Sequence, residues 1–360
     1  MSLSERQKQI LKAVISDYVL TAEPVGSKNL IKRYDLSISS ATVRNEMMAL
    51  EELGYLEKPH TSAGRIPSDK GYRAYVDELL TLSPLPEATQ QQIEERFADK
   101  VQEVAQLIKS SVDLLAEQTS YPTLALTPRY ANTSLEQIKI LMIEPGKALI
   151  VVVLSPGVVK DRMVRIPPEV DPANLAQLAQ SIELGLSGKK LNDITMITVS
   201  LAAGNSGIPE PLLNQILFEA YVSIKQAENV DVYLQGTHRL LTQPEFSDAQ
   251  KAHRVLDQMN HHALIAGYMN ELYEEPTYTV RIGQEITLDG FEDCSFITTT
   301  YRLGDNIKGQ IGVVGPRRMP YNKIISQVNF INQKLNEAIR RYAVHEDESK
   351  PGLPSGLADE

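Results

Sequence analysis

The side chains best suited to chemistry lie in the first 80 residues, and their types suit the recognition of nucleic acid. Thr42, Arg44 and Asn45 crowd the N-terminal half of a helix that we expect over 40–53. An arginine can donate two hydrogen bonds to guanine O6 and N7, and an asparagine can pair in the same way with adenine N6 and N7. The competing interpretation is an ordinary surface helix with a few polar residues, because helix-turn-helix patterns are frequent by chance.

A hairpin pattern in residues 56–73 favours the nucleic-acid interpretation over a plain surface helix. Its tip, 60–64, consists of small residues and hydrogen-bond donors, and Arg65 opens the returning strand. Such a tip suits contacts to phosphates or the minor groove, which position a protein rather than specify a sequence. The residues that we expect to bind DNA are Ser27, Ser39, Ser40, Thr42, Arg44, Asn45, Lys58, His60, Thr61, Ser62, Gly64, Arg65 and Arg73.

The elements that must position these side chains are marked by capping residues. Ser4 begins a helix with the spacing of a capping box, and apolar residues recur after it every three or four positions. A short second helix is expected over 27–34, and Ser39 or Ser40 caps the third helix. Ser68 caps a fourth helix after the hairpin. Helix-turn-helix followed by a hairpin is the order of a winged helix.

The charge distribution permits a DNA-binding segment in an acidic chain. The net charge is −10, yet residues 1–80 hold 11 Lys/Arg and 11 Asp/Glu and are neutral. The remaining 25 basic and 35 acidic residues carry the whole net charge. An acidic remainder would keep the rest of the protein away from phosphates.

Three long motifs resemble the HrcA family, the bacterial heat-inducible transcription repressors. They are residues 62–77, 40–47 and 312–321, and the similarity spans 1 to about 343. The resemblance implies a repressor of heat-shock chaperone operons that binds an inverted-repeat operator as a homodimer and depends on the chaperonin GroEL. Pro320 departs from the family pattern, in which an acidic residue is usual at this position.

The rest of the chain mixes helices with antiparallel strands. A proline-containing linker over 81–87 precedes a pattern that predicts one long helix across 93–115, with an apolar stripe. We favour packing of that stripe on its own domain over pairing with a second copy, because the repeat is short. Strands are expected at 138–143, 148–154, 159–166, 194–201, 278–282, 295–303 and 309–314, and further helices at 175–186, 212–225 and 322–343.

These patterns predict an α+β multidomain protein. We expect a winged helix-turn-helix over 1–82 and a disordered tail over 344–360, because the tail is acidic and rich in Pro and Gly. The resemblance makes the sheet domain a GAF-like α/β sandwich, built from 83–165 and 235–343 as one interrupted sheet. It also makes the interruption, 166–234, an inserted dimerisation domain.

Other classes of protein find little support. The histidines form no metal-ligand pattern, no phosphate-binding loop is present, and 309–315 has the wrong spacing for a dinucleotide fingerprint. We therefore expect no enzyme activity and no cofactor. The lone Cys294 suits a reducing cytoplasm, and no apolar run is long enough to cross a membrane. The remaining alternative is a ligand-sensing GAF-type transcription regulator.

Overall fold

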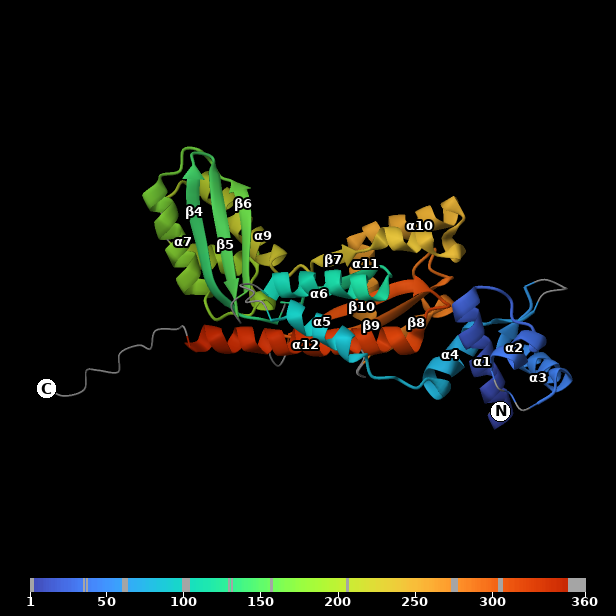
Figure 1. Cartoon of the computed structure of the whole chain (residues 1–360). Helices are drawn as coiled ribbons and strands as arrows, with labels where there is room; N and C mark the ends of the chain where they lie inside the picture. Colours follow the sequence, from blue (N-terminus) through green and yellow to red (C-terminus); the bar gives the residue numbers. More distant parts are fainter. Residues whose placement is uncertain are drawn as a thin grey trace. The chain divides into compact units, whose positions relative to one another are not determined.

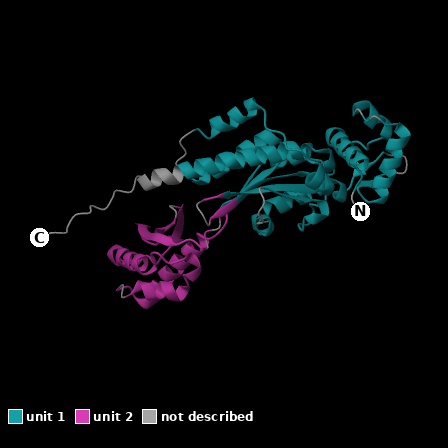
Figure 2. Ribbon diagram, turned by 90° about the horizontal axis from the view of Figure 1, so that it is seen from below, with its two compact units in different colours: residues 1–127, 232–301, 310–342 teal, residues 128–231, 302–309, 343–360 magenta. Residues whose placement is uncertain are grey.

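The computed structural model divides the chain into two compact units. Unit 1 comprises residues 1–127, 232–301 and 310–342, and unit 2 comprises 128–231, 302–309 and 343–360 (Figure 2). The residues described are 3–34, 36, 38–59, 64–98, 104–128, 130, 132–155, 158–204, 207–272, 278–303 and 307–348.

Unit 1 begins with the winged helix expected from the sequence. Its elements are α1 (Glu5–Thr21), α2 (Ser27–Arg33), α3 (Ser40–Glu52), β1 (Leu56–Glu57), β2 (Ile66–Pro67), α4 (Asp69–Ala74) and the π-helical turn η1 (Tyr75–Leu79) (Figure 1). Ser4, Ser39 and Ser68 each accept a hydrogen bond from the backbone N–H three residues later. These side chains satisfy amide groups that would lack a partner at a helix start, and they fix where each helix begins.

The second part of unit 1 is a five-stranded sheet in the order β7-β3-β10-β9-β8. The strands are β3 (Thr123–Leu126), β7 (Val232–Gln235), β8 (Thr279–Ile282), β9 (Cys294–Arg302) and β10 (Lys308–Pro316). The accompanying helices are α5 (Glu87–Arg96), α6 (Val104–Thr119), α10 (Ala249–Asn260), α11 (His262–Glu271) and α12 (Tyr321–Glu348), with short 3-10 turns η3 (Thr237–Thr242), η4 (Pro244–Phe246) and η5 (Gly283–Glu285).

Helices cover both faces of this sheet. Ser295 of β9 hydrogen-bonds Tyr321 of α12, whereas the next residue, Phe296, packs against the Tyr268 ring of α11. Successive side chains of a strand point to opposite faces, so α12 and α11 lie on opposite sides of the sheet (Figure 1). This layering confirms the α/β sandwich that was expected from the resemblance.

The single cysteine, Cys294, opens β9 and is fully buried. Burial raises the pKa of its thiol, and the nearby Asp293 carboxylate adds to that rise. The group is therefore a neutral part of the core.

Unit 2 is a three-stranded antiparallel sheet with helices on one face. Its strands are β4 (Leu135–Glu144), β5 (Lys147–Leu154) and β6 (Val158–Arg165), and its helices are α7 (Pro172–Leu186), α8 (Met196–Ala203) and α9 (Glu210–Gln226), with the 3-10 turn η2 (Leu191–Asp193). Ile138, Ile150 and Val164 belong to the buried face. The opposite face is largely exposed and carries Leu141 and Met163.

The arrangement of the sheets corrects one expectation. The strands over 135–165 form a sheet of their own in unit 2, and they do not continue the sheet of β8, β9 and β10. The inserted block expected over 166–234 therefore starts too late, since unit 2 takes in residues from 128 to 231. A hairpin pattern predicts that two strands adjacent in sequence pair with each other, but it does not predict which sheet they belong to.

Three local expectations were also wrong. Residues 194–201 were expected as a strand, but α8 begins at Met196, because the Thr195 and Thr198 side chains form a capping box there. The long helix across 93–115 is two helices, since α5 ends at Arg96. Residues 344–348, expected in the tail, continue α12, and 349–360 lie outside the described residues.

Two glycines allow a direct test of the packing of the winged helix. A Cβ atom at Gly71 of α4 would lie 2.1 Å from the Tyr55 carbonyl oxygen, whereas one at Gly267 of α11 would meet nothing within 4 Å. We expect Gly71→Ala to lower the free energy of unfolding by about 1–3 kcal/mol. The control Gly267→Ala should raise it by about 0.5–1 kcal/mol, because alanine is the better helix former. Urea unfolding measures both changes, and equal effects of the two substitutions would contradict the close packing of Gly71 against Tyr55.

Candidate nucleic-acid interface

Helix α3 presents a polar face at its N-terminal end. Val43, Met47 and Leu50 are buried, whereas Arg44 and Asn45 are exposed. The apolar residues hold the helix against the rest of the winged helix. The arginine and the asparagine expected from the sequence therefore face solvent, where they can contact DNA.

The serines and the threonine predicted as contacts cluster where α2 meets α3. The Ser39 hydroxyl accepts from the Thr42 amide at 3.1 Å and lies 2.9 Å from the Thr42 hydroxyl. The hydroxyls of Ser27 and Ser40 lie 3.2 Å apart. The structure thus brings Ser27, Ser39, Ser40 and Thr42 together at the junction of the two helices.

Lys28 is a candidate contact that the sequence reasoning missed. It lies in the first turn of α2, next to Ser27, and is exposed. In helix-turn-helix proteins the first of the two helices crosses the DNA backbone, and lysine suits a phosphate. The signal available in the sequence was the position of this lysine in the first turn of the helix expected over 27–34.

The wing places its two described cationic residues differently. Lys58 follows β1 and is exposed. Arg65 is only 16% exposed, and its guanidinium donates to the Glu51 carboxylate at 2.6 and 2.7 Å. The backbone of Arg65 also exchanges two hydrogen bonds with Val25. Arg65 therefore attaches the wing to α3 and to the segment before α2.

At Gly64 the wing lies close to the protein backbone of the segment before α2. A Cβ atom there would lie 2.4 Å from the Val25 carbonyl oxygen, so a larger residue would push the wing away. His60, Thr61 and Ser62, the other predicted contacts of the tip, lie outside the described residues.

Arg73 lies apart from this cluster. Its guanidinium donates to Glu285 at 2.8 Å, to the Val280 carbonyl at 2.6 Å and to Asp77 at 3.2 Å. Burial alone would lower the pKa of Arg73, but the hydrogen bonds and charge of Glu285 raise that pKa above its usual value. The guanidinium is thus a fixed cation directed at β8 and η5.

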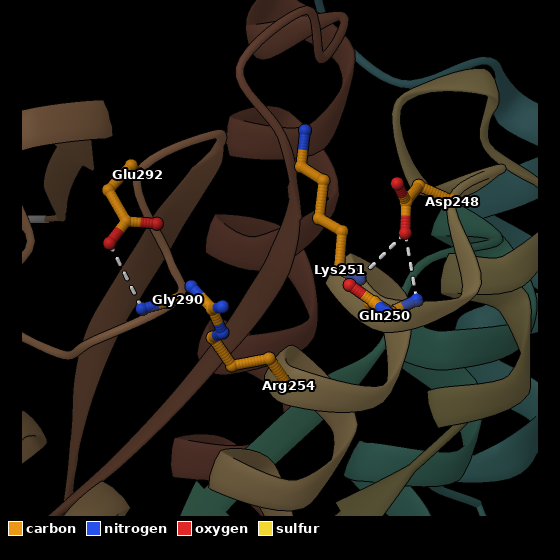
Figure 3. Close-up of a pocket in the computed structure, with 6 residues that line it drawn as sticks. All are labelled: Asp248, Gln250, Lys251, Arg254, Gly290 and Glu292. Carbon is orange, nitrogen blue, oxygen red and sulfur yellow. Dashed lines mark hydrogen bonds between the residues drawn. The ribbon is translucent and has the colours of Figure 1, made fainter.

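One hollow in unit 1 bears on the ligand-sensing alternative (Figure 3). It measures about 180 Å³ and is lined by Asp248, Gln250, Lys251, Arg254, Gly290 and Glu292. Asp248 already caps α10, and Lys251 pairs with Asp293 at 2.5 Å. Sites for drug-sized ligands are larger, about 300–1,000 Å³, and mostly apolar. This hollow therefore gives the ligand-sensing alternative no support.

Within the described part of the chain, no cluster of three or more His, Cys, Asp or Glu side chains is arranged to hold a metal ion. The helices of the same residues include none with the length and apolar character needed to cross a membrane.

Comparisons with known proteins agree with this geometry. Residues 2–78 match the family profile described as "Winged helix-turn-helix transcription repressor, HrcA DNA-binding", and residues 105–325 match that of the "HrcA protein C terminal domain". A heat-inducible transcription repressor HrcA of Ruminiclostridium cellulolyticum is 36% identical over 94% of this chain and 98% of its own. One of Acetivibrio thermocellus is 37% identical over 95% of this chain and 97% of its own. A crystal structure of a hypothetical protein shares the fold, with a TM-score of 0.63 at 20% identity over 95% of this chain and all of that one.

The winged helix, its exposed α3 face and these matches define a DNA-binding transcription repressor, not an enzyme. The chain belongs to the HrcA family of heat-inducible transcription repressors.

Proposed function

We propose that this protein represses heat-shock chaperone operons in the cytoplasm by binding an inverted-repeat operator as a homodimer, and that the chaperonin GroEL keeps it active. The observation that carries the proposal is the exposed pair Arg44 and Asn45 on α3, held by a buried apolar face. Those two side chain types, at the N-terminal half of a recognition helix, suit the edges of guanine and adenine in the major groove.

The contacts divide by role in this proposal. Arg44, Asn45 and Thr42 read bases, whereas Lys58 and the serines at the α2–α3 junction contact the backbone. The wing tip over 60–64 is assigned to phosphates or the minor groove on its sequence alone. Arg65 serves the interface by fixing the wing, because its guanidinium is already bound by Glu51.

The exposed face of the unit 2 sheet is the surface proposed for the homodimer. Leu141, Ile143, Val159 and Met163 are 50–60% exposed on β4 and β6, and Val151 lies between these strands on β5. Contiguous exposed apolar surface on a folded protein commonly marks an interaction site. A single winged helix offers a small interface with DNA, so pairing two copies supplies the second half of the contact.

The charges on this face suit a second copy of the same chain. Lys139 on β4, Val151 on β5 and Asp161 on β6 form one row across the sheet. A two-fold axis running along β5 would place Lys139 of one copy opposite Asp161 of the other and Val151 opposite itself. In the single chain Lys139 contacts Glu183 at 2.8 Å, an exposed pair that contributes little and can be exchanged.

Dependence on the chaperonin is supported by further apolar residues in unit 2. Leu184, Ile197 and Leu201 of α7 and α8 are 72–77% exposed, and they are outside the sheet face. Heat-damaged proteins would compete with the repressor for the chaperonin that restores its active fold. A marginally stable repressor then responds to a small loss of free energy with a large loss of active molecules.

The DNA-binding proposal is tested first by selecting a preferred duplex from a random pool with the full-length protein. We expect an inverted repeat. Arg44→Ala should then cost about 1–3 kcal/mol on that duplex and relax the preference at one base position. Lys58→Ala should weaken all sequences alike and lower the salt slope by about 1. Arg96→Ala, which removes the same charge from α5, is the control. An unchanged base preference in Arg44→Ala would refute the role of α3.

The homodimer proposal predicts a selective effect of a charge at the centre of the sheet face. Val151→Asp places two carboxylates opposite each other at the two-fold axis, so the dimer dissociation constant should rise at least about tenfold. Ile197→Asp, which alters an exposed apolar residue of α8, is the matched control and should leave the dimer intact. Sedimentation equilibrium distinguishes them. A Val151→Asp chain that still dimerises like the wild type would rule out this face.

The chaperonin proposal is tested by operator binding after mild heating. Binding activity should fall with heating and recover when chaperonin and ATP are added, because refolding needs the complete chaperonin cycle. Chaperonin without ATP is the control. Survival of binding without help, or failure of chaperonin to restore it, would count against this mechanism.

A further inference from the structure

Two of the long sequence motifs that mark the family meet in the structure. The motif over 62–77 contains α4, and the motif over 312–321 leads into α12. The rings of Tyr72 and Tyr321 lie 5.9 Å apart, and Asp69 pairs with Arg317 at 2.6 Å. Only part of the first motif belongs to the DNA-facing wing, so its α4 half needs another explanation.

The Asp69 side chain contacts the sheet part of unit 1, which we call the core. One oxygen of its carboxylate accepts a hydrogen bond from the Arg317 guanidinium. The other oxygen accepts from the backbone N–H of Gln284 at 3.0 Å. Gly283 makes this approach possible, because a Cβ atom there would lie 2.2 Å from the Asp69 carboxylate. Gly283 also has a positive φ of 54°, which favours glycine.

Arg317 extends the contact into the core. Its guanidinium also donates to Asp293 at 2.8 Å, and Asp293 in turn pairs with Lys251 of α10 at 2.5 Å. Burial alone would raise the pKa of Asp293, but the hydrogen bonds from Lys251 and Arg317 hold it below its usual value. These ion pairs form one chain of alternating charge, which runs through Asp69, Arg317, Asp293 and Lys251.

Two further arginines join the same parts of unit 1. Arg73 of α4 pairs with Glu285 and with the Val280 carbonyl, as described above. Arg318 donates to the Val19 carbonyl of α1 at 3.3 Å and pairs with Glu245 at 2.5 Å. The winged helix is therefore attached to the core at α4 and α1, in addition to the covalent linker.

The linker alone would not fix the direction of the winged helix. Residues 80–86 between η1 and α5 have no regular structure. Winged helices held only by such a segment would sample many directions. Binding two half-sites at once would then cost more conformational entropy. Winged helices that are fixed on unit 1 lack this freedom, which narrows the range of distances between the two recognition helices and hence the accepted half-site spacings.

We propose that Asp69, Arg73, Gly283 and Arg317 are positioning residues that fix the winged helix on the sheet part of unit 1 and thereby narrow the range of half-site spacings that the repressor accepts. The inference rests on the proposed binding of an inverted repeat by a homodimer. None of these residues needs to touch DNA for this role, and their effect falls on spacing rather than on base preference.

The test compares operator spacings in two variants that disturb the contact from opposite sides. Asp69→Asn removes the charge that Arg317 binds, and Gly283→Ala places a methyl group against Asp69 without changing the winged helix. Glu219→Gln is the matched control, because it disturbs the Arg162–Glu219 pair of unit 2, which has a similar length of 2.7 Å. The probes are the duplex that the wild type selects, the same duplex with half a helical turn inserted between its half-sites, and a single half-site.

We expect the inserted half turn, about 5 base pairs, to weaken wild-type and Glu219→Gln binding at least about tenfold. Asp69→Asn and Gly283→Ala should lose most of this discrimination while keeping wild-type affinity for the single half-site. If both variants discriminate as the wild type does, or bind the selected duplex more tightly, the inference is overturned. A collapse of half-site binding in Asp69→Asn leaves Gly283→Ala to decide. A wild type that selects no inverted repeat would instead refute the proposed function.

Discussion

The antiparallel pairing of β3 with β7 is the constraint on which the two-unit architecture depends. Leu126, at the end of β3, lies opposite Val232, at the start of β7, and β3 is buried between β7 and β10. The chain therefore leaves the unit 1 sheet and returns to it at neighbouring positions. Closing a long loop costs little more than closing a moderate one, and an insertion that folds by itself holds its own ends. The sheet can thus keep its core while the insertion carries a separate surface.

Within unit 1, the winged helix and the sheet part are stabilised by different kinds of contact. The winged helix has its own apolar centre around Val14, Leu30 and Leu50, which are fully buried. The contacts that join it to the sheet part of unit 1 include the Asp69–Arg317 and Arg73–Glu285 ion pairs, beside the packed rings of Tyr72 and Tyr321. Partly buried ion pairs of this kind add modest stability but strong directional preference, because each needs a defined geometry.

The winged helix was predictable from sequence because its signals are local. Ser4, Ser39 and Ser68 cap the expected helices, and Gly54 follows α3 with a φ of 78°, as a helix stop requires. Each signal acts over three or four residues and needs no knowledge of the distant chain. Arg44 and Asn45 were predictable for the same reason, since the helical period alone places them outside the buried stripe of Val43, Met47 and Leu50.

The features that sequence could not provide depend on contacts between distant residues. Strands β3 and β7 are short and were not expected, and only their pairing with β10 and with each other gives them a role. The residues of α8 alternate like a strand, yet the caps of Thr195 and Thr198 make them helical. Arg65 and Arg73 were taken as DNA contacts from their type, whereas their partners are Glu51 and the remote Glu285.

The burial of Cys294 makes this chain well suited to spectroscopic labelling. It is the only cysteine of the sequence, it is fully buried, and its raised pKa leaves almost no thiolate at neutral pH. Maleimide and nitroxide reagents attack thiolates that they can reach. A cysteine introduced at an exposed position such as Lys58 would therefore accept a probe selectively with the native residue left in place. In the proposed dimer, the distance between probes on the two copies could then be measured by double electron–electron resonance.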